Sequence, residues 1–251
     1  MEQYLIMKNT FKIKIHFFFY VILFISILTG HFKTFITMTI ITIIHELGHI
    51  ITSQIFKWDI DKVIVMPISL LTVYNIKINT KKYQELLVTI MGPIFQLFLF
   101  FFIKDDIILK YNLILLLFNL LPIYPLDGSK IFKILLYDYI PFIYVESINI
   151  YLSVITILFL LIISKCNLII IAVSVIFIFK VIEEYKKRKY IFNKFLFERY
   201  LYKIGYKKDK IIKGLKKDDF YKNYHHNFIT TNKIVTEEEF LSKMFDNTRV
   251  L

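Results

Sequence analysis

Long runs of Ile, Leu, Phe and Val fill residues 15–182, and they limit more than any other feature how this chain can fold. A soluble domain carries about 45–50% apolar residues, whereas 57% of these 251 residues are hydrophobic. The rest, residues 183–251, is polar and basic. This distribution excludes a single soluble globule, a disordered chain and a secreted disulfide scaffold. We therefore predict a transmembrane domain over 1–182 and a small basic cytosolic tail over 183–251.

Six apolar segments approach or reach the length of about 17–25 residues that a membrane-spanning helix needs. They are residues 16–30, 35–56, 86–103, 107–121, 151–164 and 168–182. The expected fold class is an all-α polytopic membrane protein with about six transmembrane helices. With six spans, the side that carries both termini collects most of the lysines, including Lys8, Lys12, Lys57, Lys77 and Lys130. Because basic loops stay in the cytosol, we expect a multi-pass protein of the cell membrane with both termini cytosolic.

The segment 62–77, between the second and third apolar runs, is too short to cross the bilayer. It is rich in β-branched residues and is interrupted by Pro67, which favours an extended or re-entrant, β-like segment at the membrane edge. A plain amphipathic loop fits the same residues equally well.

The net charge of +12 does not indicate nucleic-acid binding, because Lys and Arg flank apolar segments or gather in the tail. The lipid bilayer is the expected partner. The basic tail has three further interpretations: it binds anionic lipid head groups, it binds an acidic protein partner or substrate, or it is a solvated helix. Cys166 is the chain's single cysteine, so an intrachain disulfide or a cysteine metal cluster is excluded.

Inside the second apolar segment the sequence reads His45-Glu46-Leu47-Gly48-His49. Two histidines four residues apart lie on one face of a helix and can bind the same zinc ion, while Glu46 can act as a general base. Ionisable side chains inside a membrane helix cost about 2.5–3.5 kcal/mol each. Three of them in one turn therefore need a compensating partner, and a metal ion is the best candidate; a polar cluster of hydrogen-bonded side chains is the alternative.

A catalytic zinc site has three protein ligands and an open position. The best third donor is Asp127, which follows two prolines at the end of the fourth apolar segment, in Asn119-Leu120-Leu121-Pro122-Ile123-Tyr124-Pro125-Leu126-Asp127-Gly128. Asp-Gly alone is a common turn sequence. Near a zinc-binding helix, a helix broken by proline is suited to present a carboxylate to a buried metal.

These motifs, together with Gly92-Pro93 at the start of the third segment, resemble the site-2 protease family of intramembrane zinc metalloproteases. The closer resemblance is to its sporulation factor IV FB type, through Leu28-Thr29-Gly30-His31, Glu183-Glu184-Tyr185 and Phe197-Glu198-Arg199-Tyr200. The resemblance implies one zinc ion held by His45, His49 and Asp127, with Glu46 as the general base. It also implies that Asn119 and Pro125 line the substrate channel.

The same resemblance implies a membrane-associated substrate, a sporulation pro-sigma factor whose pro-segment is removed, and membrane proteins that inhibit the enzyme. Such proteases carry a nucleotide-sensing CBS domain, for which the tail is short, so a truncated or degenerate CBS-like region is expected there. A Phe-Gly-Gly turn of the family reads Pro67-Ile68-Ser69 here, and no room is left for a PDZ domain. Two alternatives remain: a site-2-type protease with another membrane substrate, and a non-proteolytic metal-binding or transport protein.

Overall fold

The computed structural model describes residues 12–66, 70–165, 167–206, 208–230 and 233–246. Lys8, Pro67-Ile68-Ser69 and Cys166, which entered the sequence predictions, lie outside these ranges. The described residues form two compact units. Unit 1 contains those up to Ile76 together with Leu87–Asn119, and unit 2 contains Lys77–Leu86 and those from Leu120 onward.

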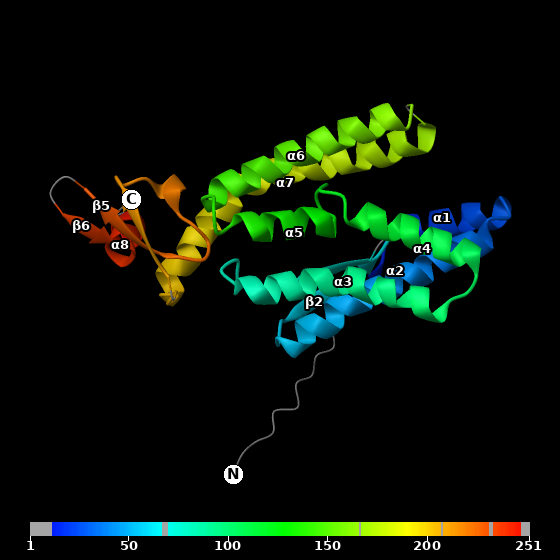
Figure 1. Ribbon diagram of the computed structural model, residues 1–251, viewed down its shortest axis with the longest axis horizontal. Coiled ribbons are helices and arrows are strands. Elements are labelled where there is room, and N and C mark those ends of the chain that lie inside the picture. The colour runs from blue at the N-terminus through cyan, green and yellow to red at the C-terminus, as the bar shows by residue number, and fades with distance from the viewer. Residues whose placement is uncertain (1–11, 67–69, 166, 207, 231–232, 247–251) are drawn as a thin grey trace, which may run out of the picture. The chain divides into compact units, whose positions relative to one another are not determined.

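Unit 1 combines helices with a small sheet (Figure 1). Strand β1 is parallel to β2, and β3 is antiparallel to β2, with Val63 opposite Thr72. In this sheet β2 is central and β3 lies at an edge. The elements of unit 1 are β1 (Lys12–Ile15), α1 (Phe17–Leu28), α2 (Phe32–Ile55), β2 (Ile60–Val65), β3 (Leu70–Tyr74), α4 (Asp106–Asn119) and most of α3 (Lys82–Phe102), whose first turn belongs to unit 2.

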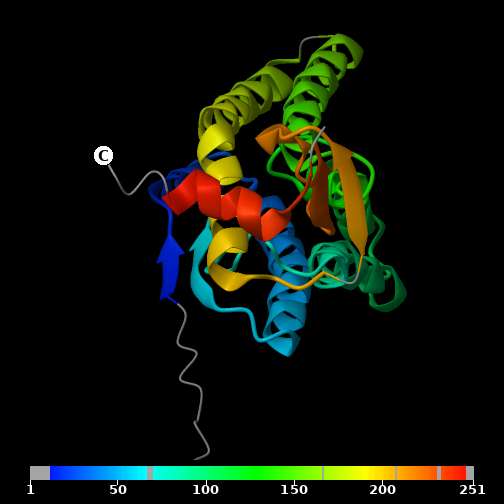
Figure 2. The ribbon, with the colours of Figure 1, turned by 90° about the vertical axis from the view of Figure 1, so that its left-hand side faces the viewer.

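Unit 2 begins with helices and ends with a second sheet. In that sheet β5 is central, parallel to β4 and antiparallel to β6. Figure 2 shows α8 lying across the C-terminal part of α7, where Phe245 packs on Phe197 and Tyr200. The elements are α5 (Asp127–Leu136), α6 (Phe142–Ile163), α7 (Leu168–Tyr202), β4 (Asp209–Lys213), a 3-10 turn (Lys217–Asp219), β5 (His225–Ile229), β6 (Ile234–Thr236) and α8 (Glu237–Asp246).

One apolar core joins the tail of the chain to the helices of unit 2. Phe142 stacks on Tyr137 and on Phe195, with ring centroids 5.3 Å and 4.3 Å apart. Phe220 and Phe228 from the tail are fully buried in the same cluster. Residues on both sides of position 182 therefore share this core, and α7 itself runs without a break from Leu168 to Tyr202.

All six predicted apolar segments are helical, in α1–α4, α6 and α7. In the part of the chain that the structure describes, three helices are long and apolar enough to cross a membrane: α2, α3 and α6. Helix α1 is apolar but shorter. The predicted apolar helices are thus present and three of them are long enough to span a membrane, whereas the count of six spans rests on the sequence.

Helix α6 buries polar side chains and exposes large apolar ones, as expected of a helix in a membrane. The residues it buries recur every three or four positions and include Glu146, Asn149 and Ser153, while large apolar side chains such as Phe159 and Ile162 are exposed. Within unit 2, Glu146 accepts hydrogen bonds from Lys133 and Tyr137. Lipid is therefore the natural environment of the outer face.

The expectation of an all-α fold is wrong in one respect, because the described residues also form two three-stranded sheets. Strands β2 and β3 occupy the β-branched segment 62–77, so the extended prediction for that segment is confirmed and the plain loop is excluded. The tail strands β4, β5 and β6 are short and lie in residues predicted only to be polar and basic. Strand β4 pairs in parallel with β5, with Asp209 opposite His225, and a local charge pattern does not reveal such a pairing.

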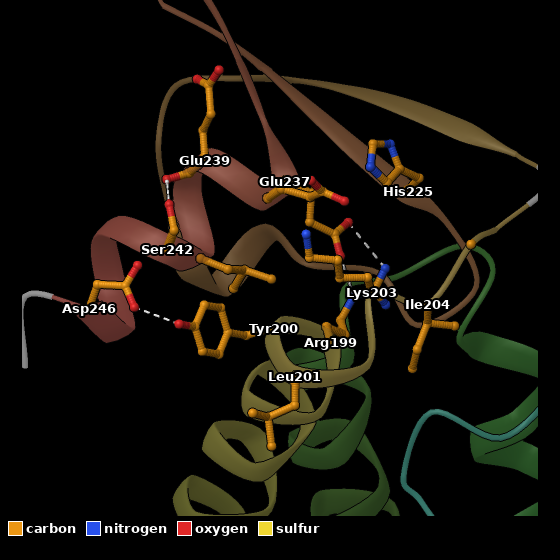
Figure 3. Close-up of a pocket in the computed structure, with 13 residues that line it drawn as sticks. Arg199, Tyr200, Leu201, Lys203, Ile204, His225, Glu237, Glu239, Ser242 and Asp246 are labelled. Carbon is orange, nitrogen blue, oxygen red and sulfur yellow. Dashed lines mark hydrogen bonds and ion pairs between the residues drawn. The ribbon is translucent and has the colours of Figure 1, made fainter.

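A buried ion-pair network holds the tail together around Arg199. Its guanidinium donates to Glu237, with Nε 2.7 Å from Oε1, and to the main-chain carbonyls of Tyr221, Lys222 and Tyr224. His226 donates its Nδ1–H to Glu237 at 2.6 Å and accepts from the main-chain N–H of Tyr221 at Nε2. A pocket of about 680 Å³ lies beside this network, between the end of α7, the start of β5 and α8 (Figure 3).

Acid should loosen this network. Burial alone would raise the pKa of Glu237, but the hydrogen bond from His226 and the charge of Arg199 outweigh it and lower the pKa to about 2. Burial lowers the pKa of His226 below its usual 6.5, and Glu237 offsets this only in part. Both groups bind fewer protons folded than unfolded, so stability falls as the pH drops below about 6.5 and falls further below 4.5.

We therefore expect amide protection of β5, measured by hydrogen exchange with mass spectrometry on the full chain and corrected for intrinsic rates, to decrease from pH 7 to pH 4. Glu237→Gln should weaken the protection already at pH 7, because removing one partner of a buried ion pair costs about 3–5 kcal/mol. Glu238→Gln changes an exposed neighbour on the same helix and is the control. Protection of β5 that does not change with pH would contradict the expectation.

Candidate metal centre

Helix α2 brings two imidazole rings together. His45 and His49 are both buried, and their Nε2 atoms lie 3.1 Å apart. The rings are nearly perpendicular, with centroids 4.9 Å apart. The spacing of four residues is the cause, since it places both side chains on one face of the helix, one turn apart.

Helix α3 supports both rings from the other side. The Nδ1 atom of His49 lies 2.7 Å from the main-chain oxygen of Val88, and the Nδ1 atom of His45 lies 2.9 Å from Oε1 of Gln96. Pro93, inside α3, has no N–H to donate to the carbonyl of Thr89, so the helical ladder is interrupted one residue after Val88. Both imidazoles are thus fixed by acceptors that belong to one neighbouring helix.

Two glycines permit this close approach of α2 and α3. A Cβ atom on Gly48 would overlap the main chain of Met91. A Cβ atom on Gly92 would lie 2.9 Å from Nε2 of His45 and closer still to the ring of His49. Glycine at both positions follows from this packing.

Glu46 points toward the sheet of unit 1. Its Oε1 accepts a hydrogen bond from the main-chain N–H of Thr72 at 3.1 Å and a second from the hydroxyl of Thr72. Because Thr72 lies on β3, the edge strand among the described residues, a buried carboxylate next to the paired histidines is in direct contact with the edge of this sheet.

The donor set of unit 1 fits zinc. The carbonyl of Val88 can only accept, so Nδ1 of His49 carries the proton and its Nε2 presents a lone pair. Two nitrogen ligands at about 2.0–2.1 Å in a tetrahedral site are about 3.3 Å apart, close to the observed 3.1 Å between the two Nε2 atoms. A cation between these nitrogens is therefore sterically and chemically reasonable.

The remaining predicted site residues belong to the region around the end of α4 and the start of α5. Asn119 is the last residue of α4, and Pro125 follows a cis peptide bond. Asp127 is the first residue of α5 and belongs to unit 2, and its Oδ1 lies 2.9 Å from Nζ of Lys130. A Cβ atom on Gly128 would overlap the carbonyl of Leu120, so the chain must turn tightly here.

Sequence reasoning missed the groups that hold the motif in place: Gln96, Asn112, Val88 and Thr72. A signal was present for Gln96 and Asn112, because each is an uncharged polar residue inside a strongly apolar run. No sequence signal identifies Val88, which acts through its main-chain oxygen, or Thr72, which depends on how β3 meets α2.

Gly92→Ala should abolish or strongly weaken zinc binding, because the new methyl group must displace one or both imidazoles. Zinc content of the purified protein, measured by inductively coupled plasma mass spectrometry, provides the readout. Gly205→Ala is the matched control, since a Cβ atom there meets nothing within 4 Å. A Gly92→Ala protein with the zinc content of the wild type would show that the rings do not occupy these positions.

Comparisons with known proteins show the family to which the chain belongs. No protein family model matches it. It is 32% identical over 208 residues to stage IV sporulation protein FB of Bacillus subtilis (strain 168), an alignment that covers 75% of this chain and 71% of that protein. Its fold resembles the solved site-2 protease from Methanocaldococcus jannaschii, with a TM-score of 0.54 and 24% identity over 68% of this chain and 89% of that one. The chain therefore belongs to the site-2 protease family and is an intramembrane zinc metalloprotease.

Proposed function

We propose that Glu46 is the general base of this protease and that His45, His49 and Asp127 hold its one zinc ion. The observation that carries the proposal is the geometry of α2, in which a buried carboxylate directly follows one of two imidazoles whose Nε2 atoms are 3.1 Å apart. Asp127 is proposed as the third ligand because it begins a helix right after a tight, proline-containing turn. Asn119, which precedes that turn, and Pro125, which lies within it, are proposed to line the substrate channel.

In the proposed mechanism, Glu46 transfers the proton that hydrolysis of the peptide bond requires. A zinc ion held by His45, His49 and Asp127 would supply Lewis acidity, which would polarise the scissile carbonyl and make a water molecule a better nucleophile at neutral pH. The Glu46 carboxylate accepts the proton that this water loses as its oxygen bonds to the carbonyl carbon. Glu46 next gives the proton to the amine nitrogen as the C–N bond breaks, and it ends the cycle ionised.

The substrate is proposed to bind as an added strand along β3. The N–H of Thr72 donates to Glu46 and not to β2, so the main chain of Thr72 faces the unpaired edge of the sheet. A peptide that pairs with this edge gains main-chain hydrogen bonds and stays extended, which a protease requires of a helical substrate. A peptide carbonyl would replace Glu46 as the acceptor of this N–H, which leaves the released carboxylate beside the peptide.

Thr72→Pro tests this pairing, because it removes the outward N–H, and with it one hydrogen bond to Glu46, without removing a ladder bond to β2. The loss at Glu46 should appear in kcat, so KM is the readout for strand addition. Thr72→Ala is the control, since it loses the hydroxyl group but keeps the N–H. We expect the KM for a peptide substrate to be about tenfold higher for the proline variant than for the alanine variant, the effect of one lost hydrogen bond. Equal KM values would argue against strand addition at β3.

The proposed topology has six spans with both termini in the cytosol. The three qualifying helices account for half of these spans, and α1, α4 and the first part of α7 would supply the rest. The distribution of lysines supports this orientation. We also propose a functional division, which falls within the continuous helix α7: residues 1–182 act as the membrane metalloprotease domain, and 183–251 act as the cytosolic tail.

For the substrate, we propose a membrane-associated sporulation pro-sigma factor from which the protease removes the pro-segment. The relative from Bacillus subtilis is named as a sporulation protein, and the aligned region spans 71% of its length. Membrane proteins that inhibit the enzyme until cleavage is required are proposed as further partners.

The decisive experiment co-expresses the chain with the candidate pro-sigma factor and detects a shortened product by immunoblot. Wild type should cleave, and Glu46→Gln should lose cleavage while it retains one equivalent of zinc, because only the proton acceptor is lost. Glu238→Gln, an exposed change on α8, should leave cleavage unchanged.

Each other outcome points to a different error. Equal loss of zinc in Glu46→Gln would contradict its assignment as general base. Zinc binding by the wild type without cleavage would leave the metal site in place and reject the pro-sigma substrate in favour of another membrane protein. Transport of a metal across vesicles without cleavage of any membrane substrate would favour the non-proteolytic alternative.

A further inference from the structure

The side-chain amide of Gln96 lies between His45 and helix α4. Its Oε1 is 2.9 Å from Nδ1 of His45, and its Nε2 donates to the main-chain oxygen of Asn112 at 2.9 Å. Asn112 in turn donates from Nδ2 to the main-chain oxygen of Gln96 at 3.2 Å. Gln96 and Asn112 are both 0% exposed. This amide therefore connects three helices, α2, α3 and α4, at the metal centre.

The orientation of the Gln96 amide is determined by chemistry. A main-chain carbonyl can only accept a hydrogen bond, so the group that faces the oxygen of Asn112 must be the amide nitrogen. The amide oxygen must then face His45. Since this oxygen is also only an acceptor, the proton between the two residues belongs to Nδ1 of His45.

We propose that Gln96 is a positioning residue of the metal centre, which holds His45 in the Nδ1–H tautomer so that the Nε2 lone pair faces the metal. The proposal rests on His45 being a zinc ligand, as proposed above. Val88 does the same for His49 through its carbonyl. A hydrogen bond to the outer nitrogen of a ligating histidine sets the tautomer and the ring orientation, and its loss typically costs 10–100-fold in metal affinity.

The competing explanation is that Gln96 only ties α3 to α4. Two substitutions separate the two roles. Gln96→Leu removes both hydrogen bonds, whereas Gln96→Glu keeps an acceptor for Nδ1–H of His45 and loses the donor to Asn112. A positioning role predicts that Glu rescues zinc binding, and a purely structural role predicts that both variants behave alike.

Zinc affinity, measured by competition with a chromophoric chelator on the purified full chain in detergent, is the first readout. We expect Gln96→Leu to bind zinc about 10–100-fold more weakly than wild type and Gln96→Glu to stay within a few-fold of it. Gln84→Leu, which changes a glutamine near the start of the same helix that bonds only weakly to the hydroxyl of Tyr83, is the matched control. Wild-type affinity in Gln96→Leu, or equal losses in the Leu and Glu variants, would overturn the proposal.

The tautomer itself is the second readout, and it needs no metal. In zinc-free protein labelled with ¹⁵N-histidine, His45, identified by its loss in His45→Ala, should show the Nδ1–H pattern in wild type and Gln96→Glu. In Gln96→Leu it should shift toward Nε2–H. A wild-type His45 protonated at Nε2 would reject the role of Gln96, whereas a correct tautomer in a protein that binds no zinc would reject the proposed metal ligands instead.

Discussion

The close packing of α2 on α3 is the interaction on which the metal centre depends. Gly48 and Gly92 leave no room for a Cβ atom at this contact, so the two helices approach until acceptors on α3 reach the outer nitrogens of both histidines. In lipid there is little hydrophobic force between helices, and small residues together with buried hydrogen bonds hold them instead. The close contact that packs α2 against α3 therefore also positions both histidines for metal binding.

The bilayer explains the inverted distribution of polar residues. Helix α6 turns Glu146, Asn149 and Ser153 inward and exposes its apolar side chains, and α2 likewise buries His45, Glu46 and His49. Each such polar group needs a partner inside the protein, because lipid offers it none. A cluster of main-chain carbonyls, amides and, in this family, a zinc ion provides those partners.

Helix α3 takes part in both units of the protein. In its first turn, Lys82 pairs with Asp138 and Glu85 with Lys222, within unit 2. Its later turns, in unit 1, supply Val88 and Gln96 to the histidines. One continuous helix thus carries contacts to the C-terminal core at one end and the supports of the metal centre further along.

The sequence by itself determined the membrane helices, the β-like segment and the zinc-binding motif, because apolar length, β-branching and the four-residue spacing are local properties. It did not determine the tail sheet, helix α5 or the supports of the histidines. Those depend on pairings between distant residues, such as His49 with Val88, Glu46 with Thr72 and Arg199 with Glu237. A main-chain carbonyl has no sequence signature, so only the tertiary structure could reveal which ones bind the site.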